Sequence, residues 1–187
     1  MDLTELKDDL GPEKVLEVYD PATGMRGFVV IDNTALGPAK GGIRMTSTVN
    51  VREVFRLARA MTFKNALAGL PFGGGKSGII YNKDTDAGKK DVFVKSFARA
   101  LKNLVPSEYI AGPDINTTEK EMKTFVEAHG NFNSATGKPT DFCKKINGKE
   151  VCGLPHELGS TGLGVSYATQ VALKHVGIPI SGAKIAI

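Results

Sequence analysis

The segment GLPFGGGKSG, residues 69–78, places a lysine and a serine directly after three consecutive glycines. These residue types are typical of phosphate-binding loops, which follow the pattern G-x-x-x-x-G-K-[ST]. The match fails at its first glycine, because Leu70 stands at that position. The order of elements also differs. A phosphate-binding loop follows a strand and opens a helix, whereas here a helical pattern precedes the glycines and a strand-like run follows them. We therefore expect Lys76 to do something other than bind phosphate.

Two further lysines and one aspartate stand in settings that favour chemistry. Lys40 precedes two glycines, Lys64 ends a predicted helix in MTFKNAL, and Asp114 lies in the loop AGPDINTT. Glycine beside a lysine lets a ligand approach closely, although it also marks tight turns, and single lysines are usually solvated. Asp114 could equally form an Asx-turn or cap a helix. Brought into one cleft, these side chains would bind carboxylates and transfer protons, because a lysine crowded by other cations has a lowered pKa.

Five motifs occur in a characteristic order along the chain: GPAKGGIRM, MTFKNALAGLPFGGGKSGI, AGPDINTT, TGKP and STGLGV. With these motifs, residues 15–187 resemble the glutamate/leucine/phenylalanine/valine dehydrogenase family, and its glutamate dehydrogenases most. The resemblance implies a substrate-binding and oligomerisation domain at residues 1–161. Residues 162–187 would then be a connecting helix and the first strand of a truncated, Rossmann-type NAD(P)-binding domain. The resemblance also implies a homo-oligomer, a hexamer in this family, and NAD or NADP as the cofactor.

The resemblance assigns catalysis to two residues. Lys76 matches the family's catalytic lysine, a base that activates water for attack on the iminium carbon of the substrate. Asp114 matches the acidic residue that moves protons to and from the substrate amino group. In this interpretation the glycines before Lys76 let the substrate and the nicotinamide pack tightly against it.

Substrate and cofactor contacts are implied for four more residues. Lys64 matches the lysine that holds the substrate α-carboxylate, and Thr161 matches a threonine near the nicotinamide amide. Lys40 matches the position that holds the side-chain carboxylate of glutamate, with Gly42 close to the substrate. Branched-chain members of the family carry an apolar residue at the position of Lys40. Because a buried cation needs a carboxylate partner, Lys40 favours glutamate over leucine.

The implied activity is the NAD(P)-dependent oxidative deamination of L-glutamate to 2-oxoglutarate and ammonium, and its reverse. A dehydrogenase for another amino acid, such as leucine or valine, is one alternative. It arises because Glu157 and Leu163 lie in regions where family glutamate dehydrogenases often carry arginines. A non-catalytic oligomerisation and ligand-binding module is another, because the chain contains no dinucleotide motif. That motif would follow Ile187, so we expect a fragment that is inactive by itself.

Composition favours a cytoplasmic globular protein. Of the 187 residues 41% are hydrophobic, which suffices for a sizeable core. A net charge of +4, from 24 basic and 20 acidic residues, is too small and too dispersed to predict nucleic-acid binding. No apolar run reaches the roughly 18 residues of a membrane span, and the acidic N-terminus MDLTELKDDLG is unlike a secretory signal. We therefore expect neither a membrane nor a nucleic-acid partner.

The elements that must position the candidate residues alternate between strands and helices. Strands are expected at 14–20, at 27–32, in a short run after the glycine-rich turn at 37–42, at 78–81 and around EYIAG, and AKIAI at 183–187 is strand-like. Helices are expected from Asn50 to Gly69, over 91–105, from Thr118 to Gly130 and over 162–177. The alternation favours an α/β fold, a three-layer α/β/α domain with a mostly parallel sheet.

The segment DFCKKINGKEVC is predicted to form a hairpin around the turn Asn147-Gly148. Counting outwards from this turn pairs Cys143 with Cys152 at a non-hydrogen-bonded position, where facing residues lie closest. The pair could form a disulfide or stay as two thiols, and a reducing cytoplasm favours the thiols. His156 lies nearby, but two cysteines and one histidine lack a fourth zinc ligand, so we expect no metal.

Overall fold

The computed structural model describes residues 4–155 and 159–186. The chain divides into two compact units, Met1–Pro155 and His156–Ile187. The first unit contains a sheet with three α-helices, and the second contains helix α4 (Ser160–His175) and the residues that follow it. The domain boundary expected after Thr161 stays a prediction.

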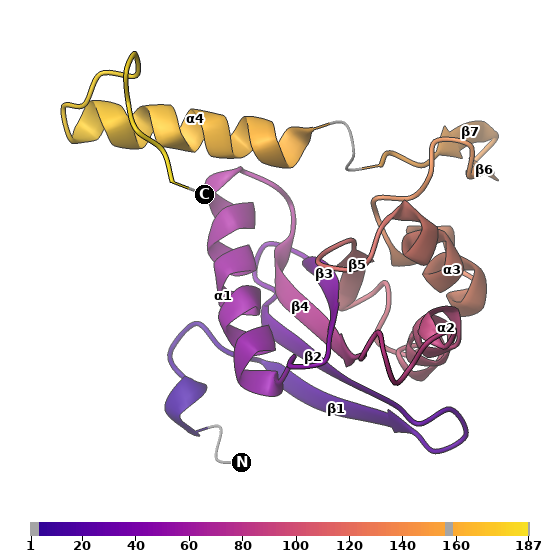
Figure 1. Ribbon diagram of the computed structural model, residues 1–187. Helices are drawn as coiled ribbons and strands as arrows, with labels where there is room; N and C mark the ends of the chain where they lie inside the picture. The colour runs from indigo at the N-terminus through magenta and orange to yellow at the C-terminus, as the bar shows by residue number, and fades with distance from the viewer. Residues whose placement is uncertain (1–3, 156–158, 187) are drawn as a thin grey trace. The chain divides into compact units, whose positions relative to one another are not determined.

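Five strands form one sheet in the order β1-β2-β4-β3-β5 (Figure 1). They are β1 (Lys14–Asp20), β2 (Met25–Asn33), β3 (Ala39–Thr46), β4 (Gly73–Ile80) and β5 (Tyr109–Gly112). Strand β2 pairs antiparallel with both neighbours, whereas β3 pairs parallel with β4 and with β5. All strands except β2 therefore run in one direction, and the prediction of a mostly parallel sheet is confirmed.

Helices cover both faces of the sheet, so the predicted three-layer α/β/α architecture is also confirmed (Figure 1). Helix α1 (Val51–Leu67) lies on one face, and α2 (Lys90–Ala100) and α3 (Glu119–His129) lie on the other. Short 3-10 turns occupy Thr4–Leu6 (η1) and Phe132–Ser134 (η2). The side chain of Asn50 caps α1 by accepting from the amide of Glu53, because the first amides of a helix lack partners inside it.

The glycine-rich segments lie inside strands rather than in loops. The run Gly73–Gly75 belongs to β4, and Gly41 and Gly42 belong to β3. A Cβ atom on Gly74 would lie 1.9 Å from the hydroxyl oxygen and 2.3 Å from the backbone nitrogen of Thr62 in α1. The expectation that these glycines make room for substrate is therefore wrong for Gly74, because the protein's own helix fills the space.

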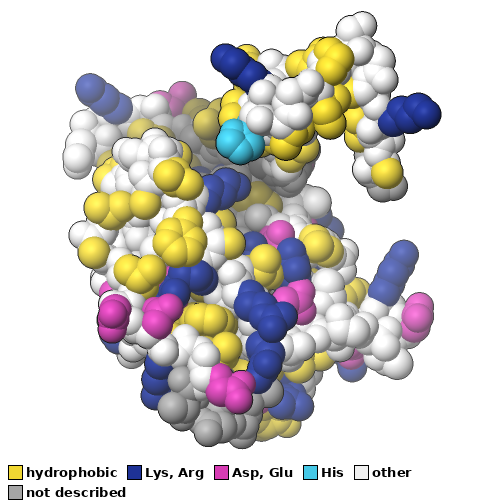
Figure 2. Space-filling model, turned by 90° about the vertical axis from the view of Figure 1, so that its left-hand side faces the viewer, with side chains coloured by type: hydrophobic (Ala, Val, Ile, Leu, Met, Phe, Trp, Pro, Cys, Tyr) yellow, Lys and Arg dark blue, Asp and Glu magenta, His cyan; other side chains and the backbone are white. Residues whose placement is uncertain are grey.

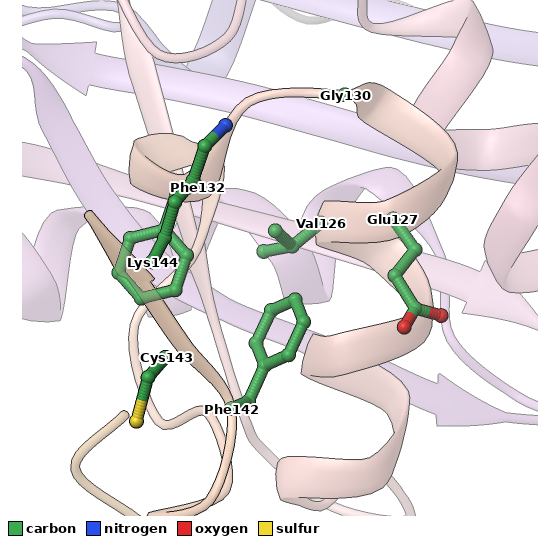
Figure 3. A pocket seen from close by; sticks show the side chains of 7 residues that line it. All are labelled: Val126, Glu127, Gly130, Phe132, Phe142, Cys143 and Lys144. Carbon is green, nitrogen blue, oxygen red and sulfur yellow. The ribbon is translucent and has the colours of Figure 1, made fainter. Parts of the chain in front are cut away.

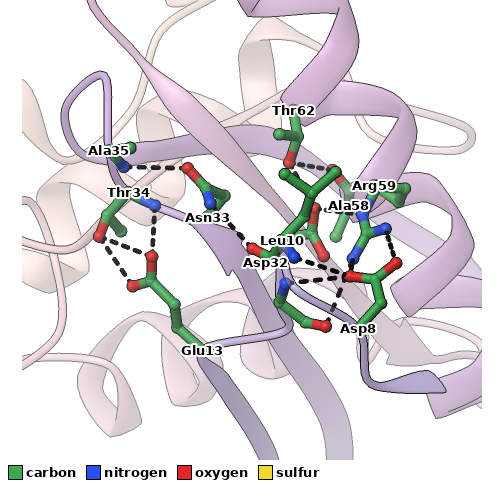
Figure 4. Close-up of polar contacts among 11 residues, drawn as sticks. Asp8, Leu10, Glu13, Asp32, Asn33, Thr34, Ala35, Ala58, Arg59 and Thr62 are labelled. Atoms are coloured by element: carbon green, nitrogen blue, oxygen red, sulfur yellow. Dashed lines mark hydrogen bonds and ion pairs between the residues drawn. The ribbon is translucent and has the colours of Figure 1, made fainter.

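A buried aspartate and an arginine tie the N-terminal segment to α1 (Figure 4). Asp32 is fully buried in β2 and accepts hydrogen bonds from Arg59 at 2.8 Å and from Thr62. Arg59 also binds both carboxylate oxygens of Asp8, which lies before β1. Close to the last residue of α1, the side chain of Asn65 donates to the carbonyl of Gly73 at 2.6 Å. These contacts hold α1 at a defined height above β2 and β4.

The hairpin forms with the predicted register. Strands β6 (Cys143–Ile146) and β7 (Lys149–Cys152) pair antiparallel, with Cys143 opposite Cys152. The two cysteines form a disulfide, so the preference for free thiols is wrong. The register itself brings the two sulfur atoms together, because the two residues face each other across the strands. His156 lies outside the described residues, and no described group of three or more His, Cys, Asp or Glu side chains could hold a metal ion.

The second unit departs from the sequence expectation at its end. Residues 183–186 form no strand, and residue 187 lies outside the description. A strand requires a hydrogen-bonded neighbour, and none is present among the described residues. Within the described residues, no helix combines the length and the apolar character needed to cross a membrane.

We predict that Gly74→Ala lowers the free energy of unfolding by about 3 kcal/mol, because the added methyl group must displace the backbone of α1. Urea unfolding followed by circular dichroism measures the change. Gly164→Ala in α4 is the control, because a Cβ atom there meets nothing within 4 Å, and it should leave stability unchanged or slightly raised. Equal stability of Gly74→Ala and the parent chain would contradict this packing.

Candidate active site

Three charged side chains share one face of the sheet because residues two apart on a strand point the same way. Lys40 and Arg44 alternate with buried Ile43 and Met45 along β3, and these two apolar residues belong to the core beneath α2 and α3. Lys76 lies two residues after Gly74, which abuts α1. The three cations therefore lie on the α1 face of β3 and β4.

Asp114 reaches this face from the loop that follows β5. A Cβ atom on Gly42 would lie 2.5 Å from the carbonyl oxygen of Pro113 and 2.7 Å from the Cβ of Asp114. Glycine at position 42 is thus what admits the Asp114 loop against β3. The hydroxyl of Thr117 holds the loop there, since it accepts from the Asp114 amide at 2.8 Å and donates to the carbonyl of Ile43 at 2.7 Å.

Lys76 and Asp114 form the central ion pair, with Nζ 3.1 Å from Oδ2. Lys76 is only 7% exposed. Burial lowers the pKa of Lys76, and Arg44 and Lys64 lower it further, while Asp114 opposes the shift. Burial raises the pKa of Asp114, but Lys76 and Arg44 outweigh it and leave that pKa below its usual value. The pair therefore combines a carboxylate with a lysine that gives up its proton more readily than a solvated lysine does.

Lys40 is a cation without a carboxylate partner among the described residues. Its ammonium donates to the hydroxyl of Thr136 at 2.5 Å. Burial lowers the pKa of Lys40 to about 8, with further lowering from Lys138, Lys64 and Lys76. Lys138 is itself buried, and its ammonium donates to the carbonyl oxygens of Phe132 and Ala135. Among the described residues Lys40 therefore has no anionic partner, and a ligand carboxylate would supply one.

Lys64 and Thr161 complete the predicted set. Lys64 is exposed near the end of α1, and its charge acts on both Lys40 and Lys76. Lys40, Gly42, Lys64, Lys76 and Asp114 are therefore brought together in the first unit. Thr161 lies exposed in the first turn of α4, in the second unit, and its part in this site stays a prediction.

Sequence reasoning missed Arg44, Thr136 and Lys138. Arg44 lies four residues after Lys40 on β3 and shares its face, but the sequence pattern predicts a turn at Lys40, so it does not indicate this relation. Thr136 and Lys138 belong to the TGKP motif, whose contacts with β3 arise from residues almost a hundred positions apart. Nothing in the local sequence indicates that distant contact.

The surface around α1 is mixed in charge. Figure 2 shows this side of the molecule, with Lys and Arg side chains grouped among Asp, Glu and apolar side chains. The face is therefore not a continuous basic surface. The lysines, Arg44 and the Asp114 carboxylate on the α1 face of the sheet can bind a small carboxylate ligand and exchange protons with it.

A hollow of about 200 Å³ lies between α3, η2 and the hairpin (Figure 3). It is lined by Val126, Glu127, Gly130, Phe132, Phe142, Cys143 and Lys144. The ring centroids of Phe132 and Phe142 lie 5.6 Å apart, and the sulfur of Cys143 is bonded to Cys152 in the disulfide. This hollow contains none of the predicted site residues, so we place the chemistry at the lysines.

Comparison with known proteins identifies the family of the chain. The family model described as the Glu/Leu/Phe/Val dehydrogenase dimerisation domain matches residues 12–130. The NADP-specific glutamate dehydrogenase of Saccharolobus shibatae is 33% identical over 203 residues, which cover 100% of this chain and 46% of that protein. The leucine dehydrogenase of Bacillus subtilis is 36% identical over 126 residues, 65% of this chain and 34% of that relative. Other relatives are named NAD-specific glutamate dehydrogenases.

Solved structures agree with this result. The hetero-hexameric glutamate dehydrogenase from Thermus thermophilus, in its leucine-bound form, superposes with a TM-score of 0.71 at 26% identity. The superposition covers 90% of this chain and 42% of that one. The chain thus spans less than half the length of the relatives that it matches.

We predict that Lys40→Met stabilises the chain by on the order of 2 kcal/mol at pH 7, because it removes a buried cation. Between pH 8 and the ordinary lysine pKa of 10.5, the unfolded chain binds more protons at Lys40 than the folded chain does. The parent chain therefore gains stability as pH rises, and the advantage of the variant should shrink.

Urea unfolding at pH 7 and at pH 10 measures both effects. The control is Lys95→Met on α2, where the parent lysine is exposed and should give no such pH dependence. A Lys40→Met advantage that is the same at both pH values would show that Lys40 does not carry this buried charge.

Proposed function

Because the chain belongs to the Glu/Leu/Phe/Val dehydrogenase family, we propose that it supplies the substrate-binding half of an NAD(P)-dependent glutamate dehydrogenase. The observation that carries the proposal is the buried Lys76–Asp114 pair beside Lys40, a half-buried cation without a carboxylate partner. An amino acid with a second carboxylate supplies what Lys40 lacks. The reaction is oxidative deamination of L-glutamate to 2-oxoglutarate and ammonium, and its reverse.

The proposed roles follow from charge and position. Lys40 binds the side-chain carboxylate of glutamate, and exposed Lys64 binds the α-carboxylate. Asp114 accepts a proton from the substrate ammonium group, so that the nitrogen lone pair is free when the Cα–H bond breaks. Lys76, with its lowered pKa, then takes a proton from water as that water attacks the iminium carbon. Return of protons to the nitrogen releases ammonium and leaves the 2-oxo acid.

A nicotinamide cofactor supplies the hydride acceptor when it is bound. Thr161 is the residue of this chain that we assign to its carboxamide, because the exposed Thr161 hydroxyl can both donate to and accept from an amide. Relatives named NAD-specific and NADP-specific support either cofactor. The family model's dimerisation domain and the hexameric structural relative support assembly into an oligomer, which we propose to be a hexamer.

A leucine dehydrogenase is the second candidate function, favoured by the 36% identity to the Bacillus subtilis enzyme. Lys40 argues against it. A substrate with an apolar side chain would leave the half-buried Lys40 ammonium with only the Thr136 hydroxyl as a partner among the described residues.

We predict different kinetic effects for Lys76→Ala and Lys64→Ala. Lys76→Ala should lower kcat at least about 100-fold with glutamate binding largely kept, because the carboxylates are held elsewhere. Lys64→Ala should weaken binding as well as rate. Steady-state kinetics and calorimetric binding on protein from the entire coding region measure both, with the 187-residue chain as a negative control. Near-normal turnover in Lys76→Ala would place the base elsewhere.

We predict that Lys40→Leu changes substrate preference. The ratio of kcat/KM for glutamate over leucine should fall by about 30-fold or more, since loss of a hydrogen bond to a charged group costs roughly 2–3 kcal/mol. Parallel assays with the two amino acids give the ratio. A ratio equal to that of the parent enzyme would remove Lys40 from substrate selection.

A further inference from the structure

Arg44 joins two carboxylates that come from different elements. Its Nε donates to Asp114 Oδ2 at 3.0 Å, and its Nη1 donates to Glu53 Oε1 at 2.6 Å. The side chain of Arg44 is only 17% exposed. A planar guanidinium presents several N–H groups at fixed angles, so contacts on two sides restrict its rotation.

The two cations beside Asp114 use the same oxygen. Arg44 Nε and Lys76 Nζ both contact Oδ2, at 3.0 and 3.1 Å. No hydrogen-bond donor among the described residues contacts Oδ1. Two donors on Oδ2 favour one orientation of the carboxylate, and they leave Oδ1 available to accept from a ligand.

Glu53 holds the guanidinium of Arg44 from the side opposite Asp114. It lies in the first turn of α1, and its amide donates to the Asn50 side chain at 3.1 Å. Because α1 packs closely on β4, with Val54 against Gly78 and Thr62 against Gly74, the helix holds the backbone of Glu53 in place and its carboxylate can anchor Arg44. Its charge also balances that of Arg44, so the group of Arg44, Glu53, Lys76 and Asp114 has no net charge.

We propose that Arg44, anchored by Glu53, is a positioning residue that orients Asp114 so that Oδ1 receives the proton of the substrate ammonium group. The N–H bond of the ammonium breaks, its proton joins Oδ1, and the electron pair stays on nitrogen. This inference rests on the proposed function, in which Asp114 is the proton acceptor.

The titratable and charged groups around Asp114 come from several elements, and Tyr109 is the neutral one among them because burial raises its pKa. They are Lys40 and Arg44 on β3, Glu53 and Lys64 on α1, Lys76 on β4, Tyr109 on β5, and Lys138 in the segment after η2. Of these, Arg44 and Lys76 lower the pKa of Asp114, and Arg44 also lowers the pKa of Lys76. Removing Arg44 should therefore raise both pKa values.

The first test uses the 187-residue chain and does not depend on catalysis. Carbon-13 NMR follows the titration of the Asp114 carboxyl group in the parent chain, in Arg44→Gln and in Arg44→Lys. Arg44→Gln should raise the pKa of Asp114 by about one unit, a tenfold change in proton affinity. Arg44→Lys keeps the charge and should give a smaller shift. The control is Arg52→Gln. Arg52 precedes Glu53 in the chain and forms an exposed ion pair with Glu5, so its replacement should not shift the pKa of Asp114.

The second test uses protein from the entire coding region. Arg44→Lys and Glu53→Gln should each lower kcat about tenfold, with the KM for glutamate changed less than about twofold, because the carboxylate-binding lysines are untouched. In Arg44→Gln the rising limb of the pH–rate profile should move to higher pH, since Lys76 then loses its proton later. Arg52→Gln should match the parent enzyme in all three quantities.

Each outcome separates the two hypotheses. An unshifted Asp114 titration in Arg44→Gln overturns the positioning role, and so does full kcat in Arg44→Lys, which would mean that charge alone matters. Full kcat in Glu53→Gln removes the anchor. Full kcat in Asp114→Asn, by contrast, overturns the assignment of Asp114 in the proposed function, and the NMR titration still decides whether Arg44 holds that carboxylate.

Discussion

The close approach of α1 to β4 is the constraint on which the rest of the structure depends. Gly74 has no side chain because the backbone of Thr62 occupies the place that a Cβ atom would need. That contact sets the height of α1 above the sheet. It thereby sets the position of Glu53 at the start of the helix and of Lys64 near its end. Asp32, Arg59 and Asn65 then hold the helix at that height.

Gly42 on β3 likewise allows a close approach, in this case of the loop that carries Asp114. Gly42 lets Pro113 and Asp114 lie directly on β3, where a larger residue would push them away. The carboxylate of Asp114 can then contact Lys76 and Arg44 together. The glycines at positions 42 and 74 thus allow parts of the protein to contact one another. They do not leave room for a ligand.

Burial and like charge act together on the lysines. Lys40 and Lys76 both have lowered pKa values, with burial as the largest cause and neighbouring cations as a further one. Holding such charges out of water costs stability, and the protein offsets only part of that cost, through Asp114 and Thr136. Lys40 lacks a carboxylate partner among the described residues, so the site is suited to a ligand that brings a carboxylate to it.

The sequence by itself determined the alternation of elements, the hairpin register and the identity of Lys40, Lys64, Lys76 and Asp114 as candidates. The elements and the register follow from local patterns, such as the turn at Asn147, whose physical causes act within a few residues. The four candidate residues follow from their glycine-rich or loop settings and from the motifs that resemble the family. Tertiary structure alone decided that the glycines before Lys76 lie in a strand, that residues 183–186 form no strand, and that Arg44 binds Asp114. The glycine strand and the Arg44–Asp114 contact each depend on a partner that is distant in the chain. Residues 183–186 form no strand because no pairing strand is present among the described residues. Strand pairing and ion pairing are contacts that local sequence does not encode.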